Sequence, residues 1–179
     1  MGRLLRIFEP GGYYHLTSRG NDGQAIVHDD LDRLDFLRWV SRIVFKEGWR
    51  LLVYCLMTNH YHFLLRAGET GFATGMQFLN CGHAHRMNRK HGRTGHLFRN
   101  HYSFREIESD EHLHETIRYI LLNPVRAGLC AEPQEWRWSS FRATADLELP
   151  PDFLALSELL AIFGTTPATA RAAFLNMFK

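Results

Sequence analysis

The chain has 179 residues, of which 45% are hydrophobic, 13% aromatic and 22% charged, and its formal net charge is +2 with neutral histidines. This composition is typical of one packed globular domain with an appendage, and it excludes a disordered chain. Scattered cysteines without a C-x-x-C pattern argue against a disulfide framework, and no signal peptide or apolar run of about 18 residues is present. We therefore expect a cytoplasmic protein that does not bind membranes.

The hydrophobic pattern assigns most of the chain to short strands and amphipathic helices. Strands are expected where apolar and polar side chains alternate, and helices where apolar side chains recur every three or four residues. In chain order, the pattern predicts a strand over 13–20, a helix over 30–48, strands over 49–58 and 60–67, a helix over 72–91, a strand over 101–108 and a helix over 109–123. Ser109 is the expected N-cap of the last helix, and Pro124 is expected to end it.

The first six elements follow the split βαββαβ order of ferredoxin-like folds. We therefore predict an α+β fold in which an antiparallel sheet carries its helices on one face, with the helix over 109–123 as an addition. The composition changes beyond Trp138, and two short helical patterns over 153–178 predict a C-terminal helical extension. The predicted division is a domain over 1–145, which includes a basic N-terminal arm, and an extension over 146–179.

Three histidine pairs have a single residue between their members: His60/His62, His83/His85 and His112/His114. On a strand, residues i and i+2 point the same way with Cα atoms roughly 6.5 to 7 Å apart, so two imidazoles can share one metal ion. On a helix, the two side chains lie about 200° apart and cannot chelate. Only the first pair lies in a predicted strand, so it is the candidate metal site. The alternative is that one member is an ordinary core or surface histidine.

Tyr119 lies in the predicted helix over 109–123 and shares a helix face with Glu115 and Asn123. Tyrosine acts as a covalent nucleophile, although a weak one at its usual pKa of about 10, and a neighbouring metal ion polarises the phosphate that it attacks. The Asn123 carboxamide is a candidate third metal ligand, and Glu115 is better interpreted as the rim of such a site. The alternative for Tyr119 is a helix-face tyrosine whose ring packs while its hydroxyl stays in water.

Five motifs occur in this order: "TSRGNDGQ", "DDLDRLDFL", "LMTNHYHFLL", "NRKHGRTGHLF" and "YILLNPVRAGL". Together they resemble the single-tyrosine HUH transposases, specifically the REP-associated tyrosine transposases, over residues 3–141. The resemblance implies a Mg²⁺ or Mn²⁺ ion bound by His60 and His62, a third ligand at Asn123 and a nucleophile at Tyr119. One departure is the His-Ala-His of "NCGHAHRMNRKHG", where an aromatic-rich helix is expected.

The resemblance also implies an activity and a partner. The expected enzyme nicks and rejoins single-stranded DNA that carries REP-like palindromic hairpins, through a 5′-phosphotyrosine intermediate. A monomer is favoured over a dimer, and the protein is expected on the nucleoid when it is bound to DNA. Two other classes stay open, namely a non-catalytic RNA- or DNA-binding module of the same fold and a replication-initiator or relaxase nuclease.

The charge distribution points to where DNA would lie. No acid occurs between Glu69 and Glu106, whereas basic residues accumulate there: Arg86, Arg89, Lys90, Arg93, Arg99 and Arg105. Because basic faces usually carry balancing acids, we predict that this stretch contacts DNA phosphates, with a solvated helix face as the alternative. Arg3 and Arg6 in the N-terminal arm are predicted to lie along the DNA as well.

Overall fold

The structure is a computed structural model that describes residues 9–179. Arg3 and Arg6, which we predicted to contact DNA, lie outside the described residues. The elements in chain order are β1 (Tyr13–Arg19), a 3-10 turn η1 (Asn21–Gly23), α1 (Asp30–Glu47), β2 (Arg50–Leu56), β3 (His60–Arg66), α2 (Ala73–His91), β4 (Ser103–Ile107), α3 (Asp110–Leu121), α4 (Asn123–Arg126), η2 (Pro133–Glu135), α5 (Phe141–Thr144), α6 (Leu156–Phe163) and α7 (Pro167–Asn176).

The four strands form one antiparallel sheet in the order β2-β3-β1-β4. This is the strand order of a split βαββαβ unit, so the predicted α+β, ferredoxin-like class is confirmed. Each observed strand falls within the range predicted for it, because alternation in β1 and β4 and the apolar run of β2 are local properties of the chain. The β1–β3 pairing sets Thr17 opposite His62 and Arg19 opposite His60.

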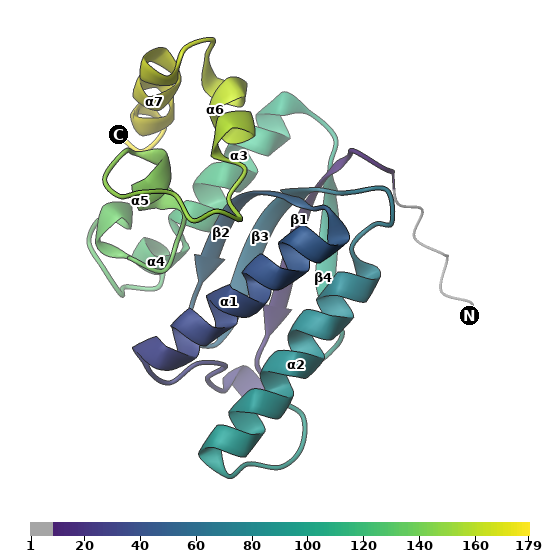
Figure 1. Cartoon of the computed structure of the whole chain (residues 1–179). Coiled ribbons are helices and arrows are strands. Elements are labelled where there is room, and N and C mark those ends of the chain that lie inside the picture. The colour runs from purple at the N-terminus through teal and green to yellow at the C-terminus, as the bar shows by residue number, and fades with distance from the viewer. Residues whose placement is uncertain (1–8) are drawn as a thin grey trace.

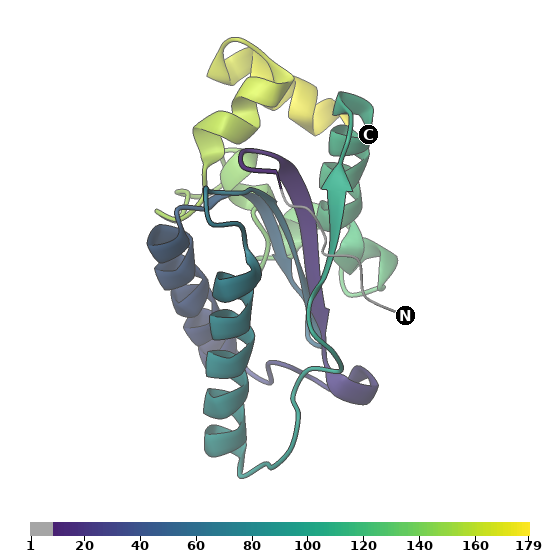
Figure 2. The same cartoon turned by 90° about the vertical axis from the view of Figure 1, so that its right-hand side faces the viewer.

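The helices of the βαββαβ unit lie on one face of the sheet, as predicted, and the added helix α3 covers the other face. The two helices of the βαββαβ unit, α1 and α2, cover the same face, whereas α3 packs on the opposite face together with the C-terminal helices (Figures 1 and 2). The reason lies in β2 and β3. Leu52, Cys55 and Leu64 project away from α1 and α2 and are completely buried, so this second apolar face also requires a cover.

The ends of the helices follow local chemistry. The Ser109 hydroxyl accepts a hydrogen bond from the backbone N–H of His112, which confirms Ser109 as the N-cap of α3. Helix α1 ends at Gly48, whose φ of +66° is a left-handed conformation that glycine adopts readily. Helix α3 ends earlier than predicted, at Leu121, and Pro124 lies in the first turn of α4. Proline has no N–H to donate, so it favours the first turn of a new helix.

The C-terminal helices share a hydrophobic core with α3. Phe174 of α7 is completely buried and its ring contacts those of Phe141, Phe163 and Phe178. The Arg118 Nε of α3 also donates a hydrogen bond to the Met177 carbonyl oxygen at 2.9 Å. No helix within residues 9–179 is long and apolar enough to cross a membrane.

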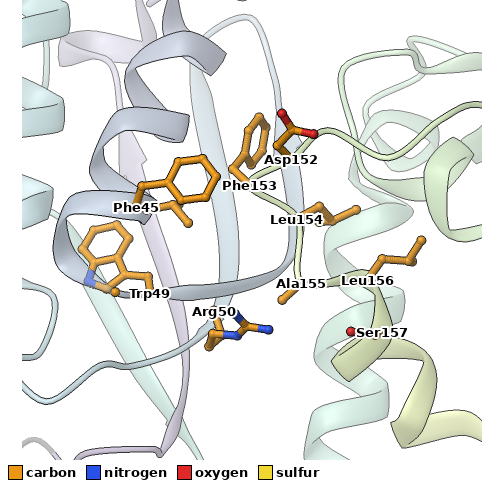
Figure 3. A pocket seen from close by; sticks show the side chains of 11 residues that line it. Phe45, Trp49, Arg50, Asp152, Phe153, Leu154, Ala155, Leu156 and Ser157 are labelled. Carbon is orange, nitrogen blue, oxygen red and sulfur yellow. The ribbon is translucent and has the colours of Figure 1, made fainter.

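A cavity of about 410 Å³ lies between the end of α1 and the segment that leads into α6 (Figure 3). Its lining includes Phe45, Trp49 and Arg50 on one side and Asp152 to Ser157 on the other. None of the predicted site residues lines it, so it is separate from the site described next.

Candidate active site

The candidate site begins with the two histidines of β3. His60 and His62 are separated by one strand residue and therefore project from the same face of the sheet, toward α3. Their ring centroids are 4.9 Å apart and their planes are nearly perpendicular, at 89°. His62 is buried, with 5% of its surface exposed, whereas His60 is partly buried. The structure thus brings the predicted pair together at the face that α3 covers.

Tyr119 reaches the same place from α3. The apolar side chains of Leu113, Ile117 and Ile120 anchor this helix in the core, which leaves Tyr119 at the border with solvent and 41% exposed. Its ring centroid lies 5.6 Å from that of His62, edge to face at 87°, and 6.0 Å from that of His15. The phenol ring is therefore next to the histidines and still accessible to a large substrate.

Asn123 approaches the histidines from the first residue of α4. Its Oδ1 lies 3.0 Å from His60 Nε2. The other ring nitrogen, His60 Nδ1, lies 2.6 Å from Asn59 Oδ1, while Asn59 Nδ2 donates to the Gly23 carbonyl oxygen at 3.1 Å. Because the Gly23 contact fixes the Asn59 amide, Asn59 Oδ1 accepts the proton of His60 Nδ1. In neutral His60, the Nε2 lone pair then faces an amide oxygen, and a cation between these two acceptors satisfies both.

His62 also presents a nitrogen without a partner. Its Nε2 is buried, and among the described residues it has no hydrogen-bond partner. The opposite nitrogen, His62 Nδ1, lies 2.9 Å from Nε2 of His15 on β1. A buried polar atom without a partner costs roughly 1–3 kcal/mol unless something else binds it, which is a reason to expect a ligand here.

Burial keeps these imidazoles neutral. Desolvation lowers the pKa of His60, lowers that of His62 well below its usual value, and lowers that of His15 to about 4, with the positive charge of Arg105 adding to the effect on His15. Neutral histidine is the form that binds metal ions, so no proton has to be removed from these rings at neutral pH.

This donor set fits a divalent cation. Two neighbouring ligands of an octahedral Mg²⁺, each bonded at about 2.1 Å, lie about 3 Å apart, and the His60 Nε2 to Asn123 Oδ1 distance is 3.0 Å. Across residues 9–179, no group of three or more His, Cys, Asp or Glu side chains is arranged to hold a metal ion. The candidate set is of another kind, because its third member is the Asn123 amide. It leaves further coordination positions for water or phosphate oxygens.

The other two histidine pairs diverge, as their helical positions require. In α2, His83 is completely buried and its Nε2 contacts the Ile26 carbonyl oxygen, whereas His85 is exposed. In α3, the Nδ1 of His114 bonds to the Asp110 carbonyl oxygen within its own helix. The unusual His-Ala-His of α2 is therefore one core histidine and one surface histidine.

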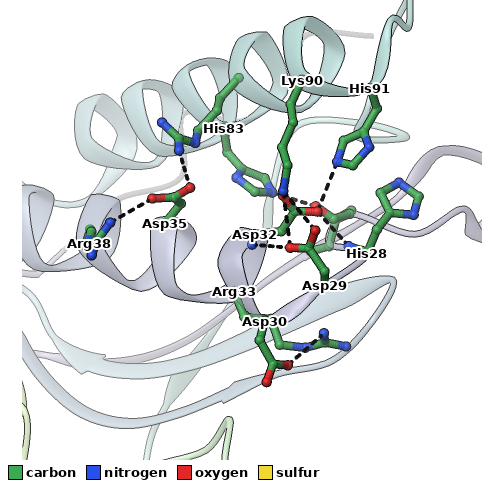
Figure 4. A network of polar contacts seen from close by, with 12 residues as sticks. His28, Asp29, Asp30, Asp32, Arg33, Asp35, Arg38, His83, Lys90 and His91 are labelled. Carbon is green, nitrogen blue, oxygen red and sulfur yellow. Dashed lines mark hydrogen bonds and ion pairs between the residues drawn. The ribbon is translucent and has the colours of Figure 1, made fainter.

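The basic residues of α2 are balanced by acids that the sequence places elsewhere. Arg86 pairs with Asp35 of α1, and Lys90 pairs with the buried Asp32 of α1 and with Asp29, the N-cap of that helix (Figure 4). Burial alone would raise the pKa of Asp32, but hydrogen bonds, led by that from Lys90, lower it to about 2. The absence of acids between residues 69 and 106 thus does not leave α2 with an unbalanced charge. Acids thus do balance Arg86 and Lys90, contrary to the premise of our charge argument, and the contact of these two residues with DNA stays a prediction.

The remaining predicted DNA contacts divide into two groups. Arg93 donates to the Gln24 side chain, and Arg89 and Arg99 are exposed. Arg105 is exposed on β4 directly opposite His15, on the face of the sheet that carries the histidines. Of this set, the structure places Arg105 beside the candidate site.

Several residues near the site were not predicted. His15, Asn59, Arg19 and Arg126 surround the histidines and Tyr119, and the Arg126 Cζ lies 5.2 Å from the Tyr119 ring centroid. Their signal in the sequence is weak, because each is a single polar residue whose neighbour comes from another element. The alternation of β1 was a usable clue for His15, since it shares a face with Thr17 and Arg19.

Known proteins match this chain both in sequence and in fold. The family model described as "Transposase IS200 like" matches residues 10–123, a range that includes His60, His62, Tyr119 and Asn123. No curated protein matches the chain by sequence.

Among solved structures, one described as a REP-associated tyrosine transposase bound to a REP hairpin matches with a TM-score of 0.70 and 15% identity. That match covers 84% of this chain and 89% of the other. A putative transposase from Deinococcus radiodurans (TM-score 0.43, 17% identity, 67% of this chain and 95% of that chain) and a tRNA(His) guanylyltransferase from Saccharomyces cerevisiae (0.44, 12%, 97% and 80%) are too dissimilar to carry an argument.

The family match covers most of the chain and ends at the residue that touches His60. The solved REP-associated transposase shares the fold over nearly the whole length of both chains. The chain belongs to the family of IS200-like transposases.

Proposed function

We propose that this transposase is a metal-dependent endonuclease and strand transferase that acts on single-stranded DNA through a 5′-phosphotyrosine intermediate. The observation that carries the proposal is the convergence of Tyr119, His60, His62 and Asn123 from α3, β3 and α4 onto one partly exposed spot. Packing alone gives no reason to place a half-exposed tyrosine beside two neutral imidazoles. A catalytic site does give a reason, because a nucleophile must lie beside the cation that polarises its target.

The proposed reaction is a transesterification. The Tyr119 oxygen attacks the scissile phosphorus, the Oη–P bond forms, and the bond to the 3′ oxygen breaks. The Tyr119 hydroxyl gives up its proton to solvent and the departing 3′ oxygen takes one up, so the products are a 5′-phosphotyrosyl link and a free 3′-hydroxyl. Attack of a 3′-hydroxyl on the link reverses the step and joins strands without ATP, because the phosphodiester energy is retained in the link.

The residues of this chain prepare that step. His60, His62 and Asn123 would hold Mg²⁺ or Mn²⁺, which when bound polarises the phosphate, a contribution worth several kcal/mol. Arg126 lies over the Tyr119 ring, where its positive charge can interact with the phosphate that Tyr119 attacks. All of these groups come from one chain, which supports activity as a monomer.

The substrate is proposed to be DNA with a palindromic hairpin. The solved transposase that shares this fold is described as bound to a REP hairpin. In this chain, Arg19 opposite His60 and Arg105 opposite His15 are both exposed, on the face of the sheet that carries the histidines. Positive groups at these positions can hold the phosphates that flank the scissile bond, while Tyr119 stays accessible from solvent.

The test is a Tyr119→Phe substitution with labelled hairpin oligonucleotides and Mn²⁺. Wild-type protein should form a covalent species that survives a denaturing gel. Tyr119→Phe should lose this species completely while it still binds the DNA, because only the attacking oxygen is removed. Tyr13→Phe is the matched control, since Tyr13 lies on the same face of β1 at the opposite end of the β1–β3 pairing from His60.

Two results would contradict the proposal. One is a covalent adduct that persists in Tyr119→Phe, which would mean that another residue is the nucleophile. The other is metal-dependent nicking that continues at the wild-type rate in His60→Ala, which would remove the histidine pair from the metal site.

A further inference from the structure

His15 makes a contact that the proposed reaction does not use. It lies on β1, diagonally across the sheet from His62 and on the same face. The His15 Nε2 is 2.9 Å from His62 Nδ1, and the two rings lie edge to edge with centroids 5.1 Å apart and planes inclined by 29°. His15 is partly buried, and its ring also meets the edge of Tyr119.

The hydrogen bond between these rings allows two proton arrangements. In the first, His62 Nδ1 donates to His15 Nε2, and His62 Nε2 carries a lone pair. In the second, His15 donates, and the single proton of neutral His62 must lie on Nε2. The second arrangement buries an N–H donor, because His62 Nε2 has no acceptor among the described residues. The first arrangement leaves a lone pair there, which is what a metal ion requires.

On this basis, which rests on the metal site of the proposed function, we propose that His15 is a positioning residue for His62. It accepts the proton of His62 Nδ1, and this hydrogen bond holds the ring against rotation and thereby directs the Nε2 lone pair of His62 to the point that His60 Nε2 also faces. Asn59 Oδ1 has the equivalent contact with His60 Nδ1. The two ligands are thus oriented by one acceptor each, from β1 and from the β2–β3 turn.

The test measures metal affinity rather than DNA cleavage. The Mn²⁺ affinity of the apoprotein is obtained from the loss of the free-ion signal in electron paramagnetic resonance. His15→Phe keeps an aromatic ring of similar shape but has no acceptor, and it should weaken Mn²⁺ binding about 10- to 100-fold. His15→Gln places an amide oxygen where His15 Nε2 was and should restore most of the affinity. His85→Phe, at an exposed histidine on the other side of the sheet, should bind like wild type.

A second measurement separates positioning from direct ligation. Pulsed resonance detects nitrogens bonded to Mn²⁺, and His15→Phe should show the same number as wild type. One bonded nitrogen fewer would make His15 a ligand and overturn the proposal. If His15→Phe does not fold, as judged by apoprotein melting, His15→Asn takes its place, because the shorter amide does not reach His62.

The outcomes distinguish this inference from the proposed function. Equal Mn²⁺ affinity in wild type and His15→Phe, with binding still lost in His62→Ala, would overturn the role of His15 alone. Wild-type protein that binds no Mn²⁺ would overturn the metal site itself, and the role of His15 with it.

Discussion

Histidine side chains of this chain are buried for two different reasons. His60 and His62 lie side by side in the proposed metal site, whereas His83 fills the core beside α2, where Phe36 and Phe98 contact its ring. Desolvation lowers the pKa of His83 to about 4, although its hydrogen bond to the Ile26 carbonyl oxygen acts in the opposite direction. The same residue type is therefore proposed to serve chemistry in β3 and serves packing in α2, and the neighbours of each histidine distinguish the two.

The buried His83 predicts a pH-dependent stability. Its ordinary pKa is 6.5 and its folded-state pKa is about 4. Between these values the unfolded chain binds a proton that the folded chain does not, so the free energy of unfolding should fall as the pH falls. For this group, the loss approaches about 1.4 kcal/mol per pH unit within the window.

His83→Gln isolates this contribution in urea unfolding between pH 7 and 4. Glutamine keeps a donor for the Ile26 carbonyl oxygen but does not titrate, so its stability should fall less steeply with pH than that of wild type. Identical slopes for the two proteins would show that His83 does not titrate in this window. The other buried histidines contribute equally to both curves and cancel in the difference.

In helix α2, contacts with neighbouring tryptophans decide whether a glycine is required at a given position. Two internal glycines, Gly75 and Gly82, weaken the intrinsic helical preference of this segment, yet the helix runs without a break from Ala73 to His91. Gly75 faces the buried Trp49, whose Nε1 donates to the Gly71 carbonyl oxygen. Gly82 faces Trp39, which is partly exposed. One glycine is thus required by packing and the other is not.

Alanine substitutions at the two positions should have opposite effects. A Cβ on Gly75 would lie 2.4 Å from Trp49 Cζ2, so Gly75→Ala should destabilise the protein by about 1–3 kcal/mol. A Cβ on Gly82 would lie 3.3 Å from Trp39, which has room to shift, so Gly82→Ala should stabilise it by up to about 1 kcal/mol. Thermal and urea unfolding measure both values. Equal effects of the two substitutions would refute the role of Trp49.

The molecule as a whole has two dissimilar faces. On one, α1 and α2 are joined by ion pairs that neutralise much of the basic charge of α2. On the other, α3 and α4 border the histidines, and exposed arginines stand beside them. DNA is therefore expected on the second face, although most of the basic residues that we predicted to bind it belong to α2 or to the loop that follows it.

Paired arginine substitutions test this assignment. Arg105→Ala should weaken binding of hairpin DNA, because Arg105 lies opposite His15 beside the site. The slope of log binding constant against log salt concentration should fall by the amount expected for about one phosphate contact. Arg86→Ala should leave DNA binding unchanged, since Arg86 is paired with Asp35 on the opposite face. Fluorescence anisotropy over a range of salt concentrations gives both quantities. A larger effect of Arg86→Ala would place the DNA along α2 instead.

The C-terminal helices test whether the chain is one cooperative unit. Phe174 of α7 is completely buried in the core that also holds Ile117 and Leu113 of α3. Phe174→Ala should therefore destabilise the whole protein by about 3–5 kcal/mol in a single unfolding transition. Leu175→Ala, at a neighbouring residue that is 38% exposed, should change stability by less than about 0.5 kcal/mol. Loss of the C-terminal helices alone, in a separate transition, would support the predicted division between residues 145 and 146.

The features that the sequence predicted correctly are local ones. The strand positions, the N-cap of α3 and the shared face of His60 and His62 follow from periodicity and from single residues such as Ser109. The end of α3 was wrong by two residues, because Pro124 is compatible both with ending a helix and with starting α4. The prediction for Tyr119 combined helical spacing with a family resemblance, and the structure places its ring beside His62.

By itself, the sequence determined the strand and helix order, and with it the side-chain directions that set His60 and His62 on one face. Tertiary structure alone decided which partners those residues have. His15 reaches His62 from 47 positions away, Asn123 reaches His60 from 63 positions away, and the acids of α1 neutralise the bases of α2. Periodicity is a property of consecutive residues, whereas hydrogen bonds and ion pairs across the fold depend on how sheet and helices pack, which no short stretch of sequence encodes.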